Sequence, residues 1–184
     1  MREYVFALLL AAAVTYLLTP LVRRGAIAAG ALHAARTRDV HVVPTPLLGG
    51  LAMYGGLATG LLIAGQLTYL RGAFPSSRTV PGLLMAGGLL VITGMIDDRW
   101  GMGAISKLAA QVAAGGILVW SQLVLSWVPG PSGRVYVLPS DLSLTLTILI
   151  VVVTINAVNF IDGLDGLAAG VVAIATRRTR GVSR

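Results

Sequence analysis

The sequence contains no cysteine and few charged residues. Without cysteine there can be no disulfide framework, no thiolate metal site and no cysteine nucleophile. Only 11% of the 184 residues are charged, whereas soluble domains carry about 25%. So few charges could not cover a water-facing surface, and 56% of the residues are hydrophobic. The composition therefore predicts a membrane protein that faces lipid over much of its surface.

Acidic residues are also scarce, with seven against fourteen basic residues and a net charge of +7. In a membrane protein such an excess of positive charge is first a signal of topology. The basic residues do not alternate with aromatic residues, as they would on many nucleic-acid-binding surfaces. We therefore do not expect nucleic acid as a partner.

Five apolar runs approach or exceed the roughly 20 residues that a membrane-spanning helix needs. They are Tyr4–Val22, Gly49–Leu70, Val80–Ile96, Ile105–Val128 and Leu142–Val158. A sixth run, Gly166–Thr176, is too short to span, and a basic tail without hydrophobic periodicity follows at 177–184. We expect an all-α polytopic membrane helix bundle with five transmembrane helices and a truncated sixth. Residues 1–176 would form the domain, and the tail would be disordered or non-native.

The distribution of arginine and lysine predicts the orientation of these helices. Six basic residues flank the first and third connecting segments on one side, and four lie on the other. The first set is Arg23, Arg24, Arg36, Arg38, Arg99 and Lys107, and the second is Arg2, Arg71, Arg78 and Arg134. The positive-inside rule then places the first, third and fifth connecting segments in the cytoplasm and the N-terminus outside. The second and fourth segments contain mainly turn formers and are expected to be short external connectors.

Most of the acidic residues fall on the predicted cytoplasmic side, at or near helix ends. They are Asp39, Asp97, Asp98, Asp162 and Asp165. Ionisable residues close to membrane depth are costly and therefore suggest function. Asp97 and Asp98 are adjacent, so their charges repel each other unless a cation or a donor lies between them. Such oxygen ligands suit Mg²⁺, and the alternative is a solvated polar stop at the end of a membrane helix.

Lys107 follows this acidic pair and begins the fourth apolar run. It is either a lysine that extends its charge to the membrane surface or a point charge that meets phosphate. His41 lies in a segment with two prolines and a glycine pair, His41 to Gly50, in which the backbone can approach a ligand closely. His41 is either a ligand contact, a base or an ordinary interfacial residue.

A second polar cluster ends the fifth apolar run. Asn156, Asn159, Asp162 and Asp165 recur at every third position, and on an unbroken helix each step of this kind turns by about 60°. The glycines that follow the two aspartates allow the helix to break there, which would turn all four polar groups toward one cavity. Turn and capping chemistry is the alternative, but it does not require two asparagines inside the preceding apolar run.

Taken in this order, these segments resemble the polyprenyl-phosphate N-acetylhexosamine-1-phosphate transferases, which are membrane enzymes that begin bacterial cell-envelope polymers. The matching stretches are Arg38–Gly50, Asp97 and Asp98 with Lys107 and Gln111, and Asn156–Gly166. The last stretch is the most specific and the first is the least specific. The resemblance covers nearly all of the chain, but only the N-terminal half of the family's fold.

The resemblance implies a reaction and its participants. The family transfers a sugar phosphate from a uridine diphosphate sugar to a polyprenyl phosphate and releases UMP, with Mg²⁺, for which Mn²⁺ could substitute. By resemblance, Asp97 and Asp98 are the catalytic carboxylates, one of which deprotonates or orients the lipid phosphate. Lys107 would meet phosphate, and Asn159 would lie beside the metal and the diphosphate. The implied location is the bacterial inner membrane, and a homodimer of the full-length form is a further expectation.

The remaining implied contacts are to substrate. Asp162, Gly163, Leu164 and Asp165 match a segment that lines the nucleoside pocket, and Asn156 begins that stretch. His41 and Thr45 match a loop that borders the same cleft. By resemblance, the short stretch of sequence between Asp98 and Lys107 favours UDP-N-acetylglucosamine as the donor substrate. A decaprenyl or undecaprenyl phosphate would be the acceptor. The alternatives are the phospho-N-acetylmuramoyl-pentapeptide transferase branch, whose corresponding segment is longer and rich in lysine, and a transporter or scaffold fragment.

The sequence departs from the family in one respect. It has no counterpart of the later cytoplasmic loops, which by resemblance would carry a further metal-binding aspartate and a histidine-rich segment. We therefore expect the 184 residues alone to be inactive as an enzyme.

Overall fold

A computed structural model describes residues 2–28, 32–33, 45–46, 49–130 and 134–161 of the chain. Six helices and two pairs of short strands make up this part. The helices are α1 (Arg2–Ala28), α2 (Gly49–Ala64), α3 (Thr68–Arg71), α4 (Thr79–Trp100), α5 (Ala104–Trp120) and α6 (Ser140–Ile161). The strands are β1 (Leu32–His33), β2 (Thr45–Pro46), β3 (Trp127–Pro129) and β4 (Val135–Val137), paired antiparallel as β1–β2 and β3–β4.

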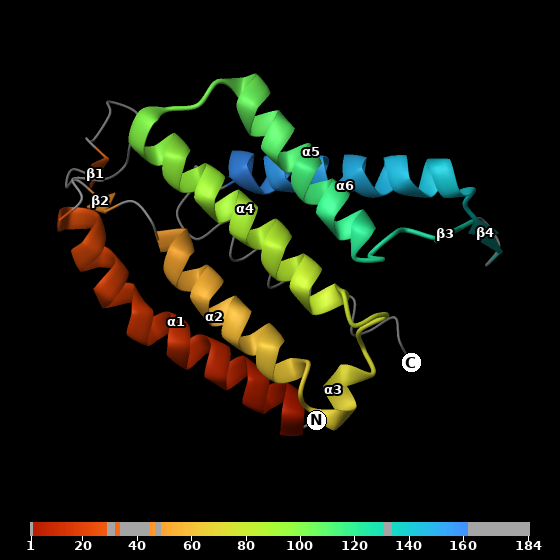
Figure 1. The fold of residues 1–184 in the computed structure, drawn as a ribbon, viewed down its shortest axis with the longest axis horizontal. Coiled ribbons are helices and arrows are strands. Elements are labelled where there is room, and N and C mark those ends of the chain that lie inside the picture. Colours follow the sequence, from red (N-terminus) through yellow and green to blue (C-terminus); the bar gives the residue numbers. More distant parts are fainter. Residues whose placement is uncertain (1, 29–31, 34–44, 47–48, 131–133, 162–184) are drawn as a thin grey trace.

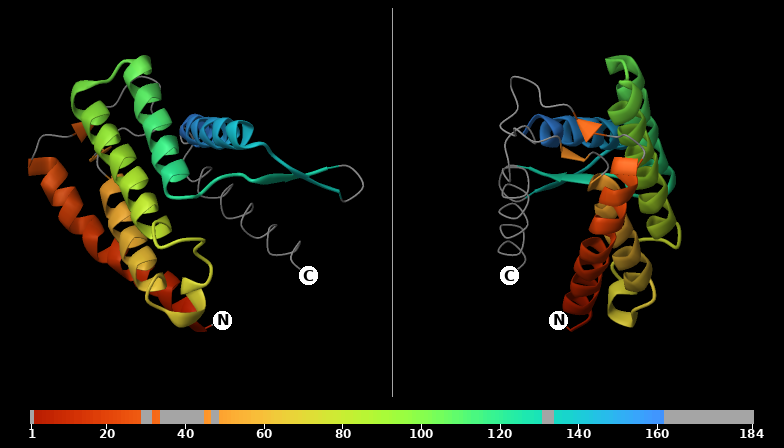
Figure 2. Two further views of the ribbon diagram at one scale, coloured as in Figure 1. Left: turned by 45° about the vertical axis from the view of Figure 1, so that its right-hand side comes forward. Right: turned by 90° about the vertical axis from the view of Figure 1, so that its left-hand side faces the viewer.

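Four of the helices form a layer in which each packs against the next. In Figure 1, α1, α2, α4 and α5 run side by side, and contacts join α1 to α2, α2 to α4 and α4 to α5. Helix α6 packs on α5 but crosses the layer obliquely. The β3–β4 hairpin extends beyond the start of α6, away from the layer (Figure 2).

The predicted all-α membrane helix bundle is confirmed. Three helices, α1, α4 and α6, are long and apolar enough to cross a membrane, and α2 and α5 are shorter apolar helices. Each of the five predicted runs thus overlaps one of these helices. The sixth run and the basic tail lie outside the described residues. Many large apolar side chains are exposed, including Tyr16 at 79% and Ile105 at 85%, as expected for a surface that faces lipid.

Two runs were predicted too long. The second breaks after Ala64, and the short helix α3 continues from Thr68. The fourth ends as a helix at Trp120 rather than at Val128, because Gln122 adopts the left-handed region with φ of 66°. The Gln122 N–H donates to the Val119 carbonyl and the Leu123 N–H donates to the Leu118 carbonyl. This is the Schellman pattern that closes a helix. The fourth connector is therefore a β-hairpin and not a plain turn.

Small residues allow the helices to approach closely. A side chain at Gly56 would overlap Thr15 of α1, and one at Gly115 would press on Ile148 of α6. The Tyr54 hydroxyl of α2 donates to the Leu84 carbonyl of α4 at 2.7 Å. Close approach of this kind is how membrane helices gain packing energy, because lipid supplies no hydrophobic drive between them.

Candidate active site at the polar ends of α4, α5 and α6

The turn between α4 and α5 is organised around Asp97. Helix α4 ends at Trp100, and the Gly101 that follows has a φ of +70°, which is readily adopted only by glycine. The Gly101 N–H donates to the Asp97 carbonyl at 2.9 Å, and the Met102 N–H donates to Asp97 Oδ1 at 2.8 Å. The carboxylate thus holds the turn that directs α5 back along α4.

The second oxygen of Asp97 binds Lys107. Lys107 Nζ lies 2.7 Å from Asp97 Oδ2, and the two side chains remain 42% and 30% exposed, respectively. A pair this accessible stabilises the fold by at most about 1 kcal/mol, but a ligand can reach it. The structure therefore brings together two of the predicted site residues, and it gives Lys107 an acidic partner rather than leaving it only at the membrane surface.

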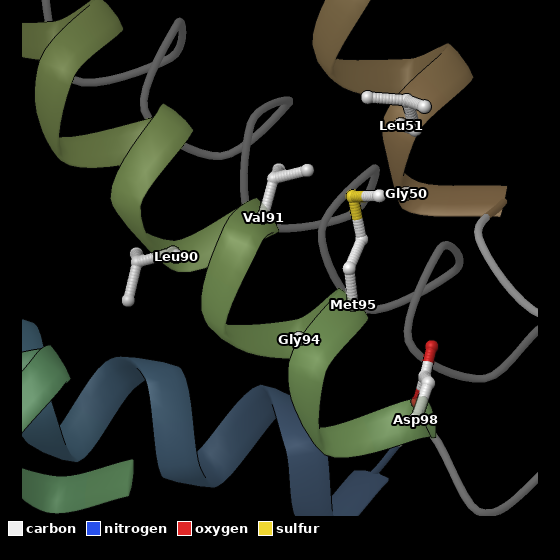
Figure 3. A pocket seen from close by; sticks show the side chains of 7 residues that line it. All are labelled: Gly50, Leu51, Leu90, Val91, Gly94, Met95 and Asp98. Atoms are coloured by element: carbon white, nitrogen blue, oxygen red, sulfur yellow. The ribbon is translucent and has the colours of Figure 1, made fainter. Parts of the chain in front are cut away.

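Asp98 faces a different space from its neighbour. Successive residues on a helix point about 100° apart, and Asp98 lies at the mouth of a pocket between α2 and α4 (Figure 3). The pocket has a volume of about 280 Å³. It is lined by Gly50, Leu51, Leu90, Val91, Gly94, Met95 and Asp98. The only charged side chain of the lining therefore stands at the end of an otherwise apolar recess.

A further polar contact joins α5 to α6. Asn156 Nδ2 donates to Gln111 Oε1 at 2.6 Å and also to the Val152 carbonyl at 2.8 Å. Gln111 follows Lys107 by four residues, which places both on the same side of α5. A line of polar groups therefore runs from Asp97 through Lys107 and Gln111 to Asn156, across three helices. Gln111 belongs to a matching stretch of the sequence, and this contact with Asn156 is what points to a role for it. The signal in the sequence that points to Gln111 is its position four residues after Lys107, in an otherwise apolar run.

The other predicted site residues are only partly placed. Asn159 is exposed one turn beyond Asn156 on α6. Thr45 belongs to β2 and pairs with His33 of β1. His41, Asp162, Gly163, Leu164 and Asp165 lie outside the described residues, so their predicted contacts remain predictions.

The described residues do not by themselves make a complete metal site. Within that part of the chain, no group of three or more histidine and acidic side chains lies close enough to hold a metal ion. Asp98 and Asn159 carry oxygen ligands of the kind that Mg²⁺ prefers, but the carboxylate of Asp97 is already engaged by Lys107 and Met102.

An acidic pair, a lysine and amide side chains at the ends of apolar helices define a membrane protein with a polar site at the membrane surface, and comparison with known proteins identifies the class. Residues 80–179 match the profile of glycosyl transferase family 4, and the chain belongs to this family. It is 47% identical over 173 residues to the decaprenyl-phosphate N-acetylglucosaminephosphotransferase of Mycolicibacterium smegmatis, covering 93% of this chain and 43% of that relative.

Two further relatives show the range of similarity. The protein of the same name from Mycobacterium tuberculosis is 43% identical over 173 residues, covering 93% of this chain and 43% of the relative. The phospho-N-acetylmuramoyl-pentapeptide-transferase of Mycobacterium bovis is 32% identical over 201 residues, covering 96% of this chain and 55% of the relative. The chain thus spans less than half the length of the first two relatives. No solved structure matches it.

Proposed function

We propose that the protein containing this chain transfers N-acetylglucosamine 1-phosphate from UDP-N-acetylglucosamine to decaprenyl or undecaprenyl phosphate. UMP is released at the cytoplasmic membrane face, and the product begins a lipid-linked cell-envelope polysaccharide. The observation that carries the proposal is the accessible pair of Asp97 and Lys107 beside the recess of Asp98, in a chain 47% identical to a transferase of this name.

The proposed reaction exchanges one phosphoanhydride partner for another. An oxygen of the lipid phosphate attacks the phosphorus that bears the sugar, a new P–O–P linkage forms, and the bond to the UMP phosphate breaks. Such a reaction requires positioning and charge neutralisation more than covalent catalysis. Lys107 supplies a positive charge toward the phosphates, and Asp97 fixes its place. We assign Asp98, at the mouth of the apolar recess, to the acceptor phosphate. Dependence on Mg²⁺ or Mn²⁺ is part of the proposal by family resemblance alone.

The function is tested with membranes that contain a full-length relative of this chain, UDP-N-acetylglucosamine labelled in the sugar, and decaprenyl phosphate. We expect equal amounts of UMP and of labelled lipid, both lost when a chelator removes divalent ions. Release of UDP instead of UMP would mean that sugar moves without its phosphate, which would refute the proposal. Activity only with UDP-N-acetylmuramoyl-pentapeptide would favour the alternative, a phospho-N-acetylmuramoyl-pentapeptide transferase. The alignment to that relative spans 201 residues, more than this chain contains, so the relative has additional residues in the matched region.

We also propose that the ends of α4 and α5 that carry Asp97 and Lys107 face the cytoplasm, where nucleotide sugars are made. Because the sequence has no cysteine, single cysteines report the side of the membrane directly. Gly103→Cys, where a side chain meets nothing within 4 Å, should react with an impermeant maleimide only after the cells are opened. Gly72→Cys, at the exposed position after α3 where a side chain would meet only the Tyr69 carbonyl at 3.9 Å, should react in intact cells. The reverse pattern would contradict the orientation.

A further inference from the structure

The β3–β4 hairpin is a regular two-stranded element. Trp127 pairs with Val137, Val128 with Tyr136, and Pro129 with Val135. Hydrogen bonds extend the ladder at both ends, from the Leu138 N–H to the Ser126 carbonyl at 2.9 Å and from the Gly130 N–H to the Arg134 carbonyl at 2.7 Å. The hairpin is thus built as an element and not as a loose connector.

Both faces of the hairpin are apolar. Opposed residues of an antiparallel pair share a face, and faces alternate along each strand. One face therefore carries Trp127, Pro129, Val135 and Val137, and the other carries Val128 and Tyr136. Trp127 is 54% exposed, Tyr136 52%, and Val137 80%. Antiparallel pairs that meet water commonly carry polar residues on the solvated face, and an isolated two-stranded hairpin is marginally stable in water.

The position of the hairpin indicates what covers it. It leaves the end of the layer where α5 stops, and it extends sideways relative to the four helices of the layer, α1, α2, α4 and α5 (Figures 1 and 2). If these four helices cross a bilayer, this direction lies along the membrane surface. Trp120, the last residue of α5, is 55% exposed, and the Arg78 guanidinium lies 5.5 Å from the centroid of its ring. Tryptophan, tyrosine and arginine together are typical of the headgroup level.

We propose that the β3–β4 hairpin lies in the bilayer itself, at the boundary between headgroups and acyl chains of the leaflet opposite to Asp97 and Lys107. The rings of Trp127 and Tyr136 and the exposed valines enter the boundary, in continuity with the lipid-facing surface of α5 and α6. Arg134, at the start of the returning strand, meets the lipid phosphates. This inference does not depend on the proposed activity, because it rests on the exposed surface alone.

The three tryptophans of the chain, at 100, 120 and 127, allow a direct test. The double variant Trp100→Phe with Trp120→Phe leaves Trp127 as the only tryptophan. The matched control, Trp100→Phe with Trp127→Phe, leaves Trp120 at the membrane end of α5. Each is placed in vesicles of phosphatidylcholine and phosphatidylglycerol, with or without bromine on the acyl chains near the headgroup. Quenching by the brominated lipid and by aqueous acrylamide is then measured.

We expect Trp127 to be quenched by brominated lipid as strongly as Trp120 and to be protected from acrylamide. Strong quenching by acrylamide without quenching by lipid would place the hairpin in water. Absence of both kinds of quenching would mean that protein covers it, either a second copy or another segment. Either result would overturn the proposal.

A substitution on the hairpin face that carries Trp127 provides a second test, in which the tryptophan whose fluorescence is measured stays unchanged. Val137 lies opposite Trp127 and is highly exposed, so a charged residue there leaves the helix packing intact. In anionic vesicles Val137→Glu should reduce lipid quenching of Trp127 more than Val137→Lys does, because the lipid phosphates repel one and attract the other. Equal effects of the two charges would contradict contact with the headgroups.

Discussion

Replacing Asp97 by asparagine at the corresponding position of a full-length relative is expected to lower the rate of UMP release by about 10²–10⁴-fold, the range for loss of a positioned acid or base. Asparagine keeps the size of the side chain, and its oxygen can still accept the bond from the Met102 N–H. It loses the charge that holds Lys107 at 2.7 Å. The effect should therefore fall on kcat, while the protein still inserts in the membrane.

Asp98→Asn should have a different kinetic signature. Because Asp98 lies at the mouth of the recess, its loss should raise the KM for the lipid phosphate in addition to lowering kcat. Asp141→Asn is the matched control, since Asp141 is an exposed carboxylate in the first turn of α6, at the far end of that helix from Asn156. Activity of the Asp97 variant equal to that of the Asp141 control would exclude a catalytic role for Asp97.

Replacing Lys107 by methionine is expected to reduce turnover by about 10²–10³-fold, as for removal of one donor that stabilises developing negative charge. Methionine preserves the length and the apolar stem of lysine but removes the cation. Lys107→Arg should restore part of the rate, because the charge returns in a different shape. Arg71→Met, at an exposed position in α3, provides the control for loss of a positive charge elsewhere.

The double variant Asp97→Asn with Lys107→Met tests whether the two residues act as a unit. Groups that act together give strongly non-additive losses. We expect the double variant to be scarcely slower than the slower single variant. Losses that multiply, as for two independent sites, would mean that the ion pair between the two side chains is incidental to turnover.

The sequence predicted where the apolar helices lie and which charged residues stand at their ends, but it did not predict which side chains of different helices contact each other. Apolar runs bounded by Asp97 and Lys107 placed both residues at helix ends, because a charge is costly deeper in a membrane. The hydrogen bond between Gln111 and Asn156 joins residues 45 positions apart. It depends on how α6 lies against α5, which no local pattern specifies.

The missed hairpin has a similar cause. Hydropathy measures apolar content and not backbone conformation, so an apolar run that continued to Val128 gave no sign that the helix ended at Trp120. The stop depends on the polar pair Ser121 and Gln122. The Ser121 hydroxyl donates to the Leu118 carbonyl at 2.7 Å, and Gln122 takes the left-handed conformation. A non-glycine residue in that conformation is uncommon, so the sequence does not predict that the helix ends at this glutamine.

The oblique course of α6 affects how deep its end lies in the membrane. Its 22 residues make a helix about 33 Å long, which matches a hydrocarbon layer of about 30 Å only when the helix stands nearly upright. An inclined helix covers less of that thickness. If the hairpin holds the Ser140 end of α6 at one membrane surface, the other end, which carries Asn156 and Asn159, does not reach the opposite surface. Those amides would then lie below the headgroup level, and an acceptor phosphate would have to sink toward them while its isoprenoid tail stayed in the hydrocarbon.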